Sequence, residues 1–168
     1  RALLITGAAG MGRTRLLMEC VERLALDGAL VLRARPLPTD HDAPWSTLRL
    51  LARSGLAQAP GLAATPPDAL SLTAWLVPEL AERVSPRAPT DSADVARALA
   101  AVLDAVVAER PMVLAIDDAH LSDAASLDVL SAVVALSAFG PYRVFRNEPP
   151  PEPSMIFSID PPAGGGFT

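Results

Sequence analysis

Apolar residues recur along this chain at two spacings, one typical of strands and the other of helices. Short apolar runs predict strands at residues 2–6, 29–34 and 112–116. Apolar residues three and four positions apart predict helices at residues 13–26, 45–54, 70–80 and 92–110, and a last helix that begins after Asp123. Because strands alternate with helices, the pattern predicts an α/β fold with a parallel sheet and helices on both of its faces.

Turn-forming and capping residues separate these elements. Gly28 ends the first helix, and Pro44 is suited to the first turn of the second. Loops are predicted at residues 59–67 and 85–90, and Pro78 bends or restarts the helical stretch between them. The last two helices have caps in the sequence, namely Asp91 or Ser92 for the one and Asp123 for the other.

The spacing also predicts which side chains are buried. The first helix presents an apolar stripe of Leu16, Leu17, Cys20, Val21 and Leu24 to the core, and the last one presents Leu127, Leu130, Val133 and Val134. Trp45 and Trp75 are interpreted as packing residues. The run at residues 112–116 does not alternate with polar positions, which is typical of a central parallel strand buried on both faces.

The composition changes after residue 138. All four phenylalanines, the single tyrosine and the only asparagine lie within residues 139–167, among many prolines and glycines. We therefore divide the chain into a domain at residues 1–138 and an irregular tail at residues 139–168. Within that tail, residues 155–159 are the one part suited to a strand.

A glycine-rich loop joins the first strand to the first helix. The spacing Gly7-x-x-x-x-Gly12-Arg13-Thr14 fits the Walker A phosphate-binding pattern except that arginine replaces lysine. Glycines let consecutive backbone N–H groups surround a phosphate, and the start of a helix adds a positive dipole. The predicted nucleotide contacts are Gly7, Ala8, Ala9, Gly10, Met11, Gly12, Arg13, Thr14 and Arg15. The alternative interpretation is a glycine-rich turn without a ligand.

Two acidic residues follow the strand at residues 112–116. The carboxyl ends of parallel strands are where ligands bind in open α/β sheets, so Asp117 and Asp118 fit a Walker B pair. We predict that Asp117 and Thr14 hold Mg²⁺ and that Asp118 orients or activates the attacking water. The alternative is a strand that simply ends in a solvated acidic turn.

Composition narrows the function classes further. The net charge of −5 argues against a surface that binds nucleic acid directly, no apolar run is long enough to cross a membrane, and no secretory signal opens the chain. With Cys20 as the only cysteine, the cytoplasm is the expected compartment. All 14 basic residues are arginine, so Arg13 reflects composition drift as well as selection. His41 lies in a polar loop and is interpreted as solvated.

Three segments together resemble a known family. LLITGAAGMGRTRLL, ALVLRARPLPTDHDAPWSTLRLL and VLAIDDAHLSDAASLDVL look like the ATPase domain of large LuxR-family transcriptional regulators, which are MalT-like signal-transducing P-loop ATPases. The resemblance covers about residues 1–138. It implies that ATP and Mg²⁺ are the cofactors and that the nucleotide state controls a C-terminal helix-turn-helix. It also matches His120 to the histidine after the Walker B pair.

The chain departs from this family in several places. Arg13 stands where the family has lysine, and Leu121 stands where it usually has tryptophan. In the family, a strand with a sensor residue lies between the Walker A and Walker B strands, and no clear candidate for it follows Leu136 unless the tail supplies one. No helix-turn-helix is present, so DNA would be contacted only through a domain outside this chain.

The sequence therefore favours one function and leaves two alternatives. The favoured interpretation is a truncated ATP-binding regulatory domain of a LuxR-type regulator, with weak or no ATP hydrolysis and with self-association of the full-length parent. The first alternative is a stand-alone P-loop NTPase or kinase, for which the sequence lacks the lysine at position 13. The second is a non-binding fragment of a degraded gene, which the composition of the tail favours.

Overall fold

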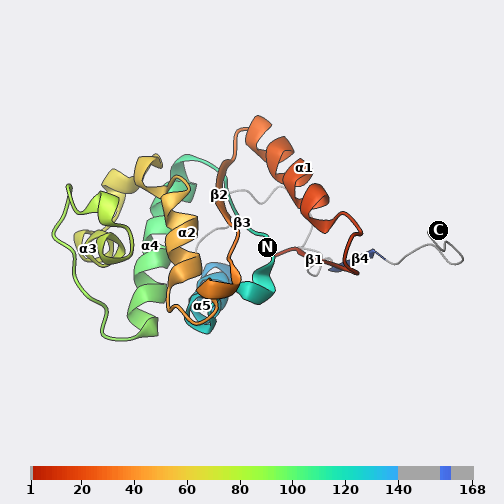
Figure 1. Ribbon diagram of the computed structural model, residues 1–168. Coiled ribbons are helices and arrows are strands. Elements are labelled where there is room, and N and C mark those ends of the chain that lie inside the picture. Colours follow the sequence, from red (N-terminus) through yellow and green to blue (C-terminus); the bar gives the residue numbers. More distant parts are fainter. Residues whose placement is uncertain (1, 140–155, 160–168) are drawn as a thin grey trace, which may run out of the picture.

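Four short strands form two parallel pairs in the computed structural model, which describes residues 2–139 and 156–159 (Figure 1). Strand β1 is Leu4–Gly7, β2 is Leu30–Ala34, β3 is Met112–Ile116 and β4 is Ile156–Ile159. β1 pairs with β4, with Leu4 beside Ile156, and β2 pairs with β3, with Leu30 beside Met112. The predicted parallel pairing is confirmed, and the tail supplies the neighbour of β1. The rest of the tail lies outside the described residues.

Five α-helices connect and cover these strands. They are α1 (Arg13–Leu26), α2 (Ser46–Arg53), α3 (Pro67–Leu76), α4 (Ser92–Glu109) and α5 (Ala124–Phe139). The stretch predicted at residues 70–80 is α3 followed by a 3₁₀ turn at Pro78–Leu80, so Pro78 restarts the helix as expected. Pro44 is not in the first turn of α2, because Trp45 adopts a left-handed conformation with φ 69° before the helix begins.

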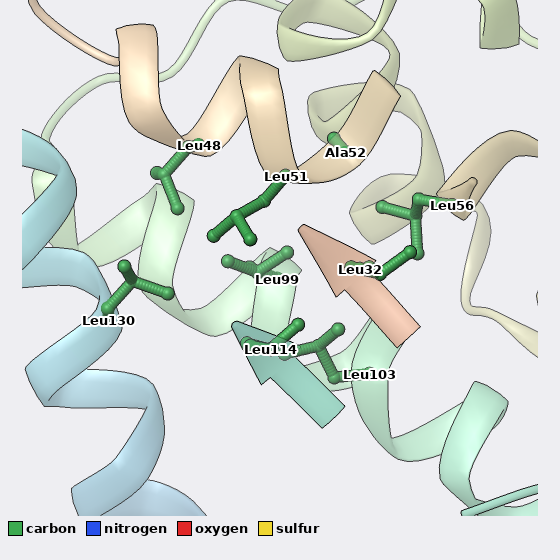
Figure 2. A pocket seen from close by; sticks show the side chains of 9 residues that line it. All are labelled: Leu32, Leu48, Leu51, Ala52, Leu56, Leu99, Leu103, Leu114 and Leu130. Carbon is green, nitrogen blue, oxygen red and sulfur yellow. The ribbon is translucent and has the colours of Figure 1, made fainter. Parts of the chain in front are cut away.

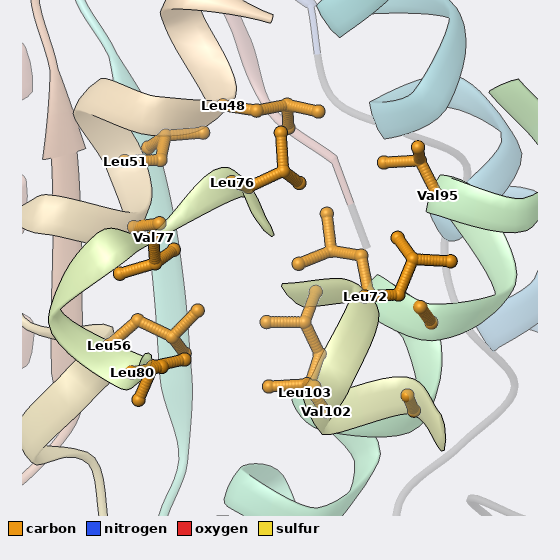
Figure 3. Packing of buried hydrophobic residues seen from close by; sticks show 14 of the residues in the cluster. Leu48, Leu51, Leu56, Leu72, Leu76, Val77, Leu80, Val95, Val102 and Leu103 are labelled. Atoms are coloured by element: carbon orange, nitrogen blue, oxygen red, sulfur yellow. The ribbon is translucent and has the colours of Figure 1, made fainter. Parts of the chain in front are cut away.

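The main hydrophobic core lies among α2, α3, α4 and α5 and one face of β2 and β3 (Figure 3). Leu72, Val77, Leu80, Val95 and Val102 are almost completely buried there. Burying a side chain of this size stabilises a fold by about 1.5–3 kcal/mol. Helix α1 contributes no residue to this cluster and lies on the other side of the β2–β3 pair from α2 (Figure 1). The helices on the core side therefore bury one face of the two strands, and α1, on the other face, is less buried than they are.

A small cavity remains where this core meets β2 (Figure 2). Its volume is about 20 Å³ and its lining is aliphatic, with Leu51, Leu99 and Leu114 pointing into it. A water molecule needs two to four polar partners to stay in such a space. The lining side chains have none, so this cavity has the character of a packing defect and not of a binding site.

Several predicted burials are wrong. On α1 only Val21 is buried, Cys20 is half-buried, and Leu16 and Leu24 are 38 % and 41 % exposed, because α1 packs mainly against the strands β1, β2 and β3. Strand β3 has only Ala115 fully buried, since within the described residues it pairs with β2 alone.

Helix α5 is also rotated from its predicted orientation. Val129 and Val133 face the core, Leu130 packs against it, and Leu127 and Val134 are exposed. The helix is apolar nearly all the way round, so the spacing of its apolar residues could not decide which side packs on α4.

Candidate functional site

The glycine loop leads from β1 into the start of α1. Gly12 precedes the first helical residue and has φ 79°, a left-handed conformation that glycine adopts without strain. No side chain caps α1, and no acidic residue lies in its first turn. The first backbone N–H groups of the helix are therefore left for another acceptor, and an anion at this position would also be favoured by the helix dipole.

The other predicted contacts follow this loop in order. Gly7 ends β1, and the turn at residues 8–11 has one internal hydrogen bond, from the Met11 N–H to the Ala8 carbonyl at 3.4 Å. Arg13 and Arg15 lie on the first turn of α1, the former half-buried and the latter exposed. Within the described residues Arg13 forms no ion pair, so no protein carboxylate competes for its charge.

The threonine of the first motif touches the first acid of the second. Thr14 Oγ1 donates a hydrogen bond to Asp117 Oδ1 at 3.1 Å, across 103 positions of the sequence. The backbone of the same residue is held by strand pairing, because the Asp117 N–H donates to the Ala34 carbonyl at 3.0 Å. The structure thus brings the two residues that the sequence predicts as metal ligands into direct contact.

Asp118 adopts an unusual backbone conformation beside this pair. Its φ of 52° is left-handed, and its N–H donates to Asp117 Oδ1 at 3.1 Å. A 3₁₀ turn at Ala119–Leu121 follows directly, and it carries the exposed His120. Non-glycine residues in this region of φ are uncommon and cluster at functional sites. The turn directs the chain away from the carboxylates and leaves them at the end of β3.

A cleft of about 390 Å³ opens between α1 and the ends of β2 and β3. Thr14 and Asp117 line it, together with Arg33 and Arg35 of the second strand and the loop after it. These arginines were not predicted from the sequence. A signal was present, because Leu32-Arg33-Ala34-Arg35 alternates apolar and basic residues, and alternate residues of a strand point to opposite faces.

Arg35 faces both acids at the end of β3. Its Nε lies 3.7 Å from Asp117 Oδ2 and 3.8 Å from Asp118 Oδ2. One edge of the Asp117 carboxylate therefore contacts the threonine of the loop, and the other contacts a guanidinium.

The comparisons with known proteins agree with this arrangement. The family described as "AAA ATPase domain" matches residues 1–145. The chain belongs to the AAA ATPase domain family. Neither the curated proteins nor the solved structures gave a match. Within the part of the chain that the structure describes, no helix is long and apolar enough to cross a membrane.

The side-chain oxygen atoms of Asp117 and Thr14 suit the metal with which ATPases of this family generally act. A carboxylate and a hydroxyl are hard oxygen ligands, and Mg²⁺ is usually held by one or two of them, with phosphate and water completing the shell. Among residues 2–139 and 156–159, no three His, Cys, Asp or Glu side chains gather into a metal cluster. The AAA ATPase domain thus offers a sparse, Mg²⁺-type donor set.

His41 is exposed, as predicted.

A buried aspartate anchors the loops that carry the candidate site. Asp123 is only 2 % exposed and accepts four hydrogen bonds. Oδ1 accepts from the N–H groups of Trp45 and Ser126, and Oδ2 accepts from Ser46 Oγ and the Thr47 N–H, at 2.8 to 3.1 Å. Burial raises the pKa of Asp123, but the hydrogen bonds from Ser126, Thr47 and Trp45 outweigh burial and lower it to about 2.

This carboxylate caps two helices at once. The prediction that Asp123 caps α5 is confirmed by its bond from Ser126 N–H, while its bonds to the start of α2 were not foreseen. The loop after β2 ends at α2, and the loop after β3 ends at α5. Asp123 therefore ties together the two loops that begin at Arg35 and at Asp117.

Proposed function

We propose that this AAA ATPase domain is the ATP-binding regulatory domain of a LuxR-type transcriptional regulator, with weak ATP hydrolysis. The observation that carries the nucleotide part is the hydrogen bond of 3.1 Å between Thr14 Oγ1 and Asp117 Oδ1. It joins a helix start with uncapped N–H groups to a carboxylate at the end of a parallel strand, and both face one cleft. The regulatory part is supported by the resemblance of three segments to LuxR-family ATPase domains.

Each residue then has a distinct role toward a bound nucleotide. The backbone N–H groups of residues 7–15 would donate to the phosphates, and Arg13 would neutralise part of their charge. Thr14 and Asp117 would hold Mg²⁺, which shields the phosphates and draws charge from the phosphoryl group. Asp118 would orient the attacking water. Arg13 is the reason for weak hydrolysis, since its rigid planar fork replaces the compact ammonium of lysine.

Calorimetric titration with ATP tests the nucleotide part. We expect binding that is at least about tenfold tighter with Mg²⁺ than without it, because the metal offsets the repulsion between Asp117 and the phosphates. Asp117→Asn keeps the shape but removes the charge, and it should abolish the Mg²⁺ dependence. Thr14→Ala should also reduce the Mg²⁺ dependence of ATP binding. Asp128→Asn, an exposed site on α5, should leave that dependence unchanged.

The same titration separates the competing functions. Absence of ATP binding by a folded wild-type chain would contradict the proposal and favour a fragment without ligand. Binding accompanied by fast turnover would favour a stand-alone NTPase. The regulatory role is tested by translating the DNA downstream of the coding segment in all three frames, where a helix-turn-helix is the expected finding.

A further inference from the structure

The two acids at the end of β3 have a fixed cationic neighbour. The β2–β3 register pairs Ala34 with Ile116, and the Asp117 N–H donates to the Ala34 carbonyl. These bonds place the next residue of the loop, Arg35, beside Asp117 through the backbone alone. Its position is therefore set by the strand pairing and does not depend on the ion pairs of its side chain.

The guanidinium itself is only loosely held. The side chain of Arg35 is 70 % exposed, and its Nε lies 3.7 and 3.8 Å from the two carboxylates, at the long end of the range for an ion pair. Such exposed pairs are weak. Within the described residues Arg35 has no other hydrogen-bond or ion-pair partner, so its two terminal nitrogen atoms are available to a ligand in the cleft.

We propose that Arg35 is a phosphate-contacting residue that the Walker B carboxylates hold only while nucleotide is absent, an inference that rests on the proposed function. A cation bound to Asp117 would weaken the hold on the guanidinium, because two positive groups at one carboxylate repel each other and share its charge. Arginine stays protonated at any physiological pH, so the released guanidinium keeps its charge and is free to bind another anion in the cleft. The terminal phosphate of a nucleoside triphosphate is the matching group, since a guanidinium binds phosphate in a bidentate manner.

The position of Arg35 next to Asp118 indicates which phosphate of the nucleotide it would contact. Asp118 is the residue proposed to orient the water that attacks the last phosphoryl group, and Arg35 contacts it. Arg35 would therefore distinguish a triphosphate from a diphosphate. A guanidinium that served only as a surface ion pair would not do so, which makes the ratio of the two affinities the informative measurement.

The test compares Arg35→Gln with wild type in three calorimetric titrations. They use Mg²⁺ alone, ATP with Mg²⁺, and ADP with Mg²⁺. We expect Arg35→Gln to weaken ATP binding by about tenfold or more and ADP binding by less than about threefold. Mg²⁺ without nucleotide should bind up to about fivefold more tightly, because its competitor is gone. Arg35→Lys should recover part of the ATP affinity. Arg53→Gln is the matched control, as Arg53 pairs with Glu79 on the surface at 3.5 Å.

The outcomes separate this inference from the function on which it rests. If wild type binds ATP but Arg35→Gln binds both nucleotides unchanged, or loses both equally, Arg35 is not the contact to the terminal phosphate and the proposed function stands. If folded wild type binds neither nucleotide, both proposals fail. A loss of the same size in Arg53→Gln would also overturn the assignment, since it would reflect net charge alone.

Discussion

Replacement of Asp123 by asparagine offers a sharp test of how the site loops are held. The substitution preserves shape and volume but removes the negative charge. Both carboxylate oxygens accept two hydrogen bonds, so the amide NH₂ of asparagine would face two donors whichever way it is turned. We therefore expect a large loss of stability at a position whose hydrogen bonds involve neither the glycine loop nor Asp117 and Asp118.

The magnitude follows from the pKa and the hydrogen bonds. Lowering the pKa from 3.8 to about 2 corresponds to about 2 kcal/mol of stability when the group is ionised. Leaving a buried donor without an acceptor costs about 1–3 kcal/mol, which is a second measure of the same hydrogen bonds and is not added to the first. A loss of about 2–3 kcal/mol is a large part of the 5–15 kcal/mol typical of a domain.

The lowered pKa of Asp123 also predicts how the stability difference between wild type and Asp123→Asn changes with pH. Because the pKa of Asp123 is lower in the folded chain than in the unfolded one, its contribution is complete above about pH 4 and is lost as the pH falls toward 2. The advantage of wild type over Asp123→Asn should therefore be largest at neutral pH and shrink between pH 4 and pH 2.

Urea unfolding followed by circular dichroism at pH 7, 4 and 3 measures both quantities. Asp128→Asn, an exposed aspartate on the same helix, controls for the loss of one negative charge. The reasoning is refuted if Asp123→Asn costs less than about 1 kcal/mol at pH 7. It is also refuted if the difference from wild type is as large at pH 3 as at pH 7.

Two further predictions concern the glycine loop and the core. Arg13→Lys should change ATP affinity little and raise single-turnover hydrolysis about tenfold, or about 1.4 kcal/mol of barrier, because lysine can follow the transferring phosphoryl group; equal rates would show that arginine is a competent substitute. Gly61→Ala should destabilise the fold by about 3 kcal/mol or more in thermal unfolding, since a Cβ there would lie 2.2 Å from the Ala105 carbonyl oxygen at φ +84°. Gly28→Ala, with φ +96° and open space, should cost only about 1–2 kcal/mol, and equal losses would contradict the role of the clash.

Local features of the fold were predictable because they depend on neighbouring residues. The cap at Asp91 is confirmed by its bond from the Asp94 N–H at 2.7 Å, which spans three positions. The strand, glycine loop and helix at residues 4–26 follow from the same kind of short-range pattern. Burial was predicted less well, since the exposure of Leu16 and Leu24 depends on what α1 packs against.

The candidate site likewise has residues that the sequence could predict and residues that it could not. The sequence alone predicted that Thr14 and Asp117 act together, because each belongs to a motif in which the chemistry requires that residue at that spacing, and the structure places the two in contact. Only the tertiary structure decided that Arg35 faces Asp117, and that Asp123 caps α2 as well as α5. The second contact of Asp123 spans 76 positions of the sequence. The physical reason is that a hydrogen bond within one turn is set by local backbone angles, whereas a partner far along the chain is set by how helices and strands pack.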